Sequence, residues 1–115
     1  MWKVFDDHHG RPRLLYHGLR GRRALPLDAW LAAEIKWVSE GSNPYYWSAF
    51  HCYLDIGAIG RWLRRCRKIT NRVAVEVDVK GVTKKPTKGE AYLARSMRVG
   101  RRQWTQRIPL DNLCT

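Results

Sequence analysis

The sequence has few cysteines, no long apolar run and few acidic residues, and each shortage excludes a class of protein. Cys52, Cys66 and Cys114 are odd in number and widely spaced, which argues against a disulfide framework and fits reduced thiols. No window approaches the roughly 18 uninterrupted apolar residues of a transmembrane helix. The N-terminus also lacks the apolar core of a secretory signal. We therefore expect a cytoplasmic protein with no membrane partner.

Basic residues dominate the charge. The 22 Lys and Arg residues oppose 10 Asp and Glu, which gives a formal net charge of +12. Hydrophobic residues still make up 44% of the 115 residues, which is enough for one core and excludes a disordered basic tail. We expect a single domain over residues 1–115. Its positive field predicts nucleic acid, a ribonucleoprotein or an acidic protein as the partner.

The residue pattern predicts an α+β fold, in which a small antiparallel sheet packs against one main amphipathic helix. That helix is expected over about residues 55–68, with Asp55 as its N-cap, and a shorter helix over about residues 28–33, with Asp28 as its N-cap. An N-terminal hairpin is expected around a polar linker. Further strands are expected over 34–38 (where a continued helix is the alternative), 45–54, 72–82 and 92–104, with a break at Gly100 as an option in the last.

The main predicted helix is the first candidate binding surface. At helical spacing its apolar residues gather on one side, and its cations gather on the other: Arg61, Arg64, Arg65 and Lys68. No acidic residue follows Asp55 in this segment, so the like charges repel one another. We predict that this face docks on an acidic partner; a merely solvated helix surface is the alternative.

Other cations and several aromatic residues gather in predicted loops and near strand ends. The cations are Arg20, Arg22 and Arg23, Lys84, Lys85 and Lys88, and Arg98, Arg101 and Arg102. Exposed aromatic rings give nucleic-acid bases a surface on which to stack, and Tyr45, Tyr46 and Trp47 are the candidates. Packing in or beside the core is the alternative for these rings. The chain has no helix-turn-helix, zinc-finger or RNP signature, so sequence-specific readout is not predicted.

Residues for metal or nucleophilic chemistry do not occur at suitable spacings. His8 and His9 are adjacent in a polar linker, and there is no CxxC or HxxxH pair, so no metal site is predicted. Neighbouring residues of a strand face opposite sides, so His51 and Cys52 should not form a catalytic dyad. On these grounds we predict no catalytic residue and no cofactor.

Two segments nevertheless resemble known families. Leu14–Gly18 (LLYHG) and Tyr46–His51 (YWSAFH), the second ahead of a predicted helix, resemble small phage and prophage proteins with a YHG…SGFH layout. The resemblance extends loosely from about Tyr16 to Val99. It implies a protein encoded by a phage or another mobile element, which would act in the cytoplasm of the host cell.

The same two segments are faintly similar to ADP-ribosyltransferases of the His-Tyr-Glu kind. This similarity implies an NAD site in which His17 binds the nicotinamide ribose and Tyr46 or Tyr53 stacks near the nicotinamide. The chain departs from that family in two ways: Ala49 replaces the expected glycine, and residues 92–104 lack the catalytic glutamate of a late strand.

The preferred interpretation is therefore a non-enzymatic, basic binding module. Its Arg-rich surface would dock on nucleic acid, a ribonucleoprotein or an acidic host protein, and anti-defence or host-takeover inhibition is a role consistent with its size and charge. An NAD-using ADP-ribosyltransferase-like enzyme is the first alternative, and a structural or assembly protein is the second.

Overall fold

The computed structural model describes residues 1–15, 23–39, 45–63, 70–87 and 89–113. The described elements form antiparallel sheets with helices, as the α+β prediction requires. In chain order they are β1 (Trp2–His8), β2 (Arg11–Arg13), β3 (Trp30–Ala32), β4 (Trp37–Val38), β5 (Tyr46–Trp47), β6 (Phe50–Tyr53), α1 (Ile56–Leu63), β7 (Arg72–Glu76), β8 (Asp78–Lys84), β9 (Ala91–Arg98), α2 (Arg101–Thr105), β10 (Ile108–Pro109) and the 3₁₀ helix η1 (Leu110–Leu113).

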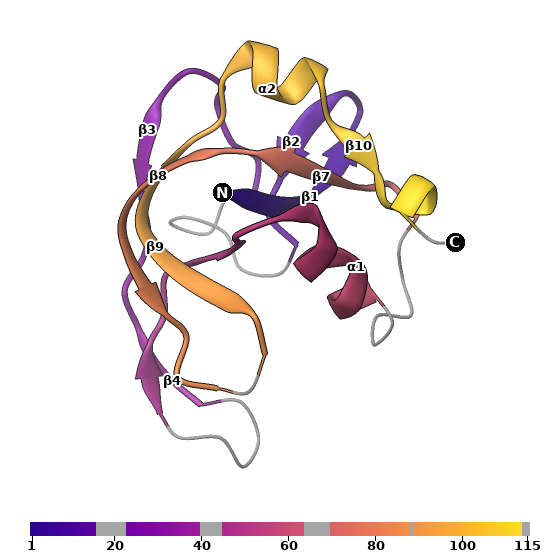
Figure 1. The fold of residues 1–115 in the computed structure, drawn as a ribbon. Coiled ribbons are helices and arrows are strands. Elements are labelled where there is room, and N and C mark those ends of the chain that lie inside the picture. Colours follow the sequence, from indigo (N-terminus) through magenta and orange to yellow (C-terminus); the bar gives the residue numbers. More distant parts are fainter. Residues whose placement is uncertain (16–22, 40–44, 64–69, 88, 114–115) are drawn as a thin grey trace.

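The main sheet curls so far that the chain connection between β7 and β8, rather than a pairing, closes it (Figure 1). β7 pairs with β1, β1 with β6, β6 with β9, and β9 with β8. Only Val77 separates β8 from β7 along the chain, so the five strands form a small barrel. β9 changes its partner along its length, since residues 91–94 pair with β6 and residues 96–98 pair with β3. β4 and β5 form a separate hairpin.

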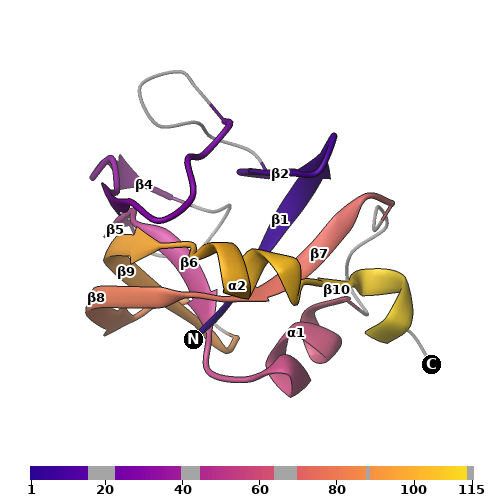
Figure 2. The same cartoon turned by 90° about the horizontal axis from the view of Figure 1, so that it is seen from above.

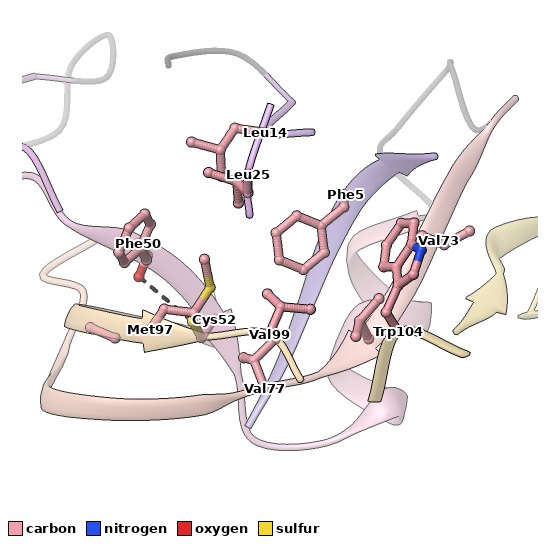
Figure 3. Packing of buried hydrophobic residues seen from close by; sticks show 12 residues of the cluster. Phe5, Leu14, Leu25, Phe50, Cys52, Val73, Val77, Met97, Val99 and Trp104 are labelled. Atoms are coloured by element: carbon pink, nitrogen blue, oxygen red, sulfur yellow. Dashed lines mark hydrogen bonds between the residues drawn. The ribbon is translucent and has the colours of Figure 1, made fainter. Parts of the chain in front are cut away.

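The core lies on both faces of β1 and β7, and Figure 3 shows the larger of the two clusters. Inside the barrel, Phe5 meets Trp104 edge to face at a ring-centroid distance of 6.4 Å, and Val75 packs in the same cluster. On the outer face, Ala74 packs with Ile59 of α1. Because side chains alternate along a strand, one strand pair thus supplies both clusters.

The N-terminal hairpin is confirmed, but its turn is tighter than the polar linker suggested. β1 and β2 continue to His8 and Arg11, which face each other across the pair. The turn consists of His9 and Gly10, with φ of 53° and 79°. Two central residues with positive φ match the right-handed twist of the flanking strands.

The predicted short helix over about residues 28–33 is wrong. Trp30–Ala32 form β3, which pairs with β9, so tertiary pairing overrides the helix propensity of this alanine-rich segment. Asp28 has a φ of 62° and is not an N-cap of its own segment. Its Oδ1 instead accepts a hydrogen bond from the backbone N–H of Arg101, at 3.0 Å, at the start of α2.

The main helix begins where the sequence predicts. Asp55 Oδ1 accepts a hydrogen bond from the N–H of Ala58 at 2.8 Å, which is the expected N-cap contact. Within α1, Ile59 and Leu63 are buried and Arg61 is exposed. The rest of the predicted helix, residues 64–68, lies outside the described residues.

Three predicted long strands are interrupted. Residues 45–54 contain β5 and β6, and residues 72–82 are divided at Val77, because β7 pairs with β1 and β8 pairs with β9. The strand predicted over residues 92–104 ends at Arg98, and the break allowed at Gly100 is confirmed. Gly100 is the N-cap of α2, where the side chain of Gln103 accepts a hydrogen bond from the Gly100 N–H at 2.8 Å, so a strand beyond Gly100 is wrong. Within the described ranges, no helix is long and apolar enough to cross a bilayer.

Candidate functional site

The predicted binding face of the main helix has one described cation, Arg61, and it forms an ion pair with Glu90. Arg61 donates hydrogen bonds from Nε and Nη2 to the two carboxylate oxygens of Glu90, both at 2.6 Å. The hydrogen bonds from Arg61 lower the pKa of Glu90, so the acid is charged at neutral pH. Arg64, Arg65 and Lys68 lie outside the described residues.

The basic loop near residue 20 has one described cation, Arg23, and it stabilises the fold. Arg23 Nη2 lies 2.9 Å from Asp6 Oδ2, and Arg23 Nε donates a hydrogen bond to the Leu14 carbonyl at 2.8 Å. This guanidinium therefore holds the segment that follows β2 against β1. Arg20, Arg22 and His17 lie outside the described residues.

Lys84 and Lys85, at the end of β8, both approach aromatic rings. Lys84 Nζ donates a hydrogen bond to the Gly89 carbonyl at 2.6 Å and lies 4.9 Å from the centroid of Tyr92. Lys85 Nζ lies 5.4 Å from the centroid of Tyr46 at the base of the β4–β5 hairpin. Lys85 thus places positive charge beside the hairpin, while Lys84 stays with the turn that joins β8 to β9. Lys88 lies outside the described residues.

A more concentrated group of cations surrounds Trp30 on the outer face of β3, β8 and β9. The antiparallel register places Trp30 opposite Arg98. Lys80 Nζ lies 4.0 Å and Arg98 Cζ lies 5.1 Å from the centroid of the Trp30 ring, and this side chain is 40% exposed. Cations at these distances are attracted to the electron-rich face of an indole.

Asp78 holds Arg98 in place beside this ring. Its Oδ2 accepts hydrogen bonds from Arg98 Nε at 3.1 Å and Nη2 at 2.7 Å, and its Oδ1 accepts one from Gln103 at 3.1 Å. The hydrogen bonds from Arg98, followed by the one from Gln103, lower the pKa of Asp78 against the opposing effect of burial. The carboxylate is therefore charged at neutral pH and orients the guanidinium.

The first turn of α2 adds Arg101 and Arg102 to the same side of the molecule. Arg101 Nε donates to Asp28 Oδ2 at 2.9 Å, yet its side chain remains 82% exposed. Hydrogen bonds from Arg101, the backbone N–H first, lower the pKa of Asp28. A shallow depression lies between the two ion pairs and is lined by both aspartates and by Arg98, Arg101 and Arg102. We call Trp30, Lys80, Arg98, Arg101 and Arg102 the basic face.

The predicted aromatic residues divide between two sides of the β4–β5 hairpin. Tyr45 and Trp47 are each 60% exposed, as the stacking prediction requires, and Trp37 is 55% exposed beside them. Tyr46 is only 5% exposed, and its hydroxyl lies 3.5 Å from His51 Nε2. The proposed roles of Tyr46 in base stacking and in nicotinamide stacking are therefore not supported, because its ring is covered.

The groups considered for catalysis or metal binding are buried or dispersed. Cys52 is fully buried, and burial raises the pKa of its thiol, which disfavours the reactive thiolate. In the part of the chain that the structure describes, no three His, Cys, Asp or Glu side chains come together as metal ligands would.

Sequence reasoning missed Trp30, Lys80 and Trp37. Trp30 and Lys80 meet only through β9, which pairs with both of their strands, so their separation in sequence conceals the contact. For Trp37 a usable signal existed: in a hairpin, residues at alternate positions share a face, and Tyr45 and Trp47 are two positions apart. Trp37, which faces Trp47 across the hairpin, should therefore be exposed as well.

The sequence matches no known family model, and comparison with curated proteins and with solved structures finds no match to either.

Proposed function

We propose that this protein is a nucleic-acid-binding module that holds the phosphate backbone on its basic face. The observation that carries the proposal is the placement of Lys80 and Arg98 around the exposed ring of Trp30, with Arg101 and Arg102 in the adjoining turn. Arginine forks bind phosphate oxygens in pairs, and the indole between the cations offers a surface for a sugar or a base.

The arrangement favours a long, extended ligand such as a nucleic-acid chain. β3, β8 and β9 lie side by side along one side of the molecule, with α2 at one end and the β4–β5 hairpin at the other (Figure 1). Lys80 of β8, Arg98 of β9 and the arginines of α2 lie on the strands and the helix of this side. Asp28 and Asp78 orient two of the arginines in advance, so fewer side chains must be ordered when the ligand binds.

The role expected from the resemblance to phage proteins fits within this proposal. A small module that covers phosphate on a nucleic acid or a ribonucleoprotein would block a host complex that handles nucleic acid. An acidic protein or NAD becomes the candidate ligand if the protein binds no nucleic acid.

The test is a fluorescence-anisotropy titration of labelled single-stranded DNA, RNA and duplex DNA at about 50 to 300 mM salt. We expect the affinity to fall steeply with salt. The double variant Lys80→Gln/Arg102→Gln should reduce the slope of log K against log salt by about 1.4 for single strands and about 1.8 for duplex.

The matched control is Arg11→Gln/Arg61→Gln, which removes the same charge from β2 and α1. It should keep the wild-type slope. If the control loses as much slope as the basic-face variant, the basic face has no special role in binding. If the wild type binds no nucleic acid at the lowest salt, the proposal fails, and pull-downs of acidic host proteins and a thermal-shift test with NAD become the next experiments.

A further inference from the structure

The β4–β5 hairpin presents one aromatic side and one anchored side. Trp37 faces Trp47 across the pair, and Val38 faces Tyr46. Because side chains alternate along each strand, Trp37, Tyr45 and Trp47 project from one side, and Val38 and Tyr46 project from the other. We call the first three residues the aromatic platform.

The rings of the platform contact one another and remain open to solvent. Trp37 and Tyr45 are nearly parallel, with an interplanar angle of 15° and a centroid distance of 5.9 Å, and Trp37 lies 5.0 Å from Trp47. Each of the three side chains is at least 55% exposed. Large apolar side chains in one exposed patch mark a binding site more often than scattered ones do.

The hairpin is held in position by groups other than these rings. Ser48 N–H donates to the Lys36 carbonyl at 2.7 Å, and Lys36 N–H donates to Ser48 Oγ at 3.0 Å. On the anchored side Tyr46 is buried. The backbone and Tyr46 therefore fix the platform, and the exposed rings are available for contact with a ligand.

The charges around the platform favour an anionic ligand. Lys36, whose side chain is 69% exposed, immediately precedes Trp37, whereas Lys85 lies against Tyr46 on the anchored side of the hairpin. Among the described residues, Glu34 lies 3.3 Å from Lys36 Nζ and offsets part of this charge. The hairpin also follows directly from β3, which contributes Trp30 to the basic face.

We infer that the protein binds single-stranded nucleic acid, with unpaired bases stacked on Trp37, Tyr45 and Trp47 while the basic face holds the phosphates. This inference rests on the proposed function and adds the form of the ligand. Bases in a duplex already stack on each other, whereas unpaired bases can place their faces on protein rings. The platform therefore discriminates between single strands and duplex, and the basic face does not.

The experiment compares Trp37→Leu/Trp47→Leu with wild type on an unstructured oligothymidine and on duplex DNA. Leucine keeps an apolar side chain in the hairpin but removes the stacking surface. We expect a loss of roughly tenfold or more in affinity for the single strand and little change for duplex, because each base–ring stack contributes substantially. The salt slope should be unchanged, since no charge is removed.

Tyr45 provides a conservative variant, and Trp62 provides a matched control. Tyr45→Phe retains a ring and should bind as wild type does, whereas Tyr45→Ser should weaken single-strand binding. Trp62→Leu makes the same substitution on α1, away from the hairpin, and should leave affinity unchanged (Figures 1 and 2). Circular dichroism and thermal unfolding of each variant verify that the fold is retained.

The outcomes separate this inference from the proposed function. If wild type binds neither nucleic acid, the proposed function fails. If wild type binds single strands and the platform variants bind them equally well, the inference is overturned and the basic face stands alone. An equal loss for duplex and single strand also overturns it, because stacking would then not be the mechanism.

Discussion

Two regions of the molecule reverse the usual placement of charged and aromatic side chains. On β1, Lys3 is 8% exposed inside the barrel, and its Nζ lies 5.9 Å and 5.8 Å from the ring centroids of Phe5 and Phe50. On the β4–β5 hairpin, Trp37 and Trp47 are more than half exposed. Lysine side chains are usually exposed and tryptophan side chains are usually largely buried, and these two regions show the opposite.

The two unusual placements differ in the contacts that offset their free-energy cost. Lys3 Nζ donates a hydrogen bond to the His51 carbonyl at 2.9 Å and lies near two aromatic rings, so the fold itself supplies partners. The aromatic platform has contacts among its own rings and leaves most of their surface in water. The contacts of Lys3 assign the first reversal to the structure, and we propose that the second serves binding.

The largest expected effect tests the core that surrounds Lys3. Phe5 is fully buried and packs against Trp104. Phe5→Ala should lower the free energy of unfolding by about 3–5 kcal/mol, since it removes a large apolar side chain and leaves a cavity. Urea unfolding followed by circular dichroism measures the loss. Val82→Ala, at an exposed position of β8, is the control and should change stability by about 0.5 kcal/mol or less; similar losses at both positions would contradict the assignment of the core.

The next prediction tests whether the contacts of Lys3 fully offset the free-energy cost of burying its charge. Burial lowers the pKa of the Lys3 ammonium below its ordinary value of 10.5, and the nearby Cys52 acts in the opposite direction. Below the folded-state pKa the lysine is charged in both states, and the folded state bears the desolvation. Between that pKa and 10.5 the unfolded state binds more protons, so the Lys3 contribution to stability rises with pH.

Lys3→Met isolates this contribution, because methionine fills similar space without a charge. We expect the variant to be more stable than wild type by on the order of 1 kcal/mol below the folded-state pKa. The difference should shrink as the pH rises toward 10.5. Urea unfolding of both proteins from neutral to alkaline pH provides the measurement, and a difference that stays constant with pH would show that Lys3 remains charged in the fold throughout.

Part of the fold follows from local chemistry, and the sequence predicts that part. Asp55 is a side-chain N-cap and begins α1 as expected, since capping involves only residues within one turn. Residues 28–33 have good helix formers but become a strand, because pairing with β9 decides their structure. The alternating valines predict one strand over residues 72–82, yet the chain pairs with β1 before Val77 and with β9 after it. Alternation with a period of two identifies a strand but does not identify the strand that it pairs with.

The candidate site shows the same division. Arg61 looks like part of a binding face until Glu90, distant in sequence, is placed against it. The group of Lys80, Trp30 and Arg98 comes from three strands and requires the sheet order. The exposure of Tyr45 and Trp47 was predictable in part, because alternation separates them from Tyr46, but which side would be covered depends on where the hairpin meets the barrel.

The smallest expected effect on stability is at the aromatic platform. It tests most directly whether the exposed rings contribute to stability. Tyr46 and Trp47 are neighbours on one strand that face opposite sides of the hairpin, with exposures of 5% and 60%. Trp47→Leu should cost about 1 kcal/mol or less, because cross-strand ring contacts contribute only about 0.2–1 kcal/mol each. Tyr46→Ala should cost several times more, since it empties a buried site.

Urea unfolding of these two variants compares the structural contribution of each ring directly. A small cost at Trp47 combined with a large loss of single-strand affinity would place the role of this ring in the ligand contact. If Trp47→Leu costs as much as Tyr46→Ala, the exposed rings hold the hairpin together. The exposure of the platform would then be a by-product of packing, and the second reversal would have the same structural origin as the buried Lys3.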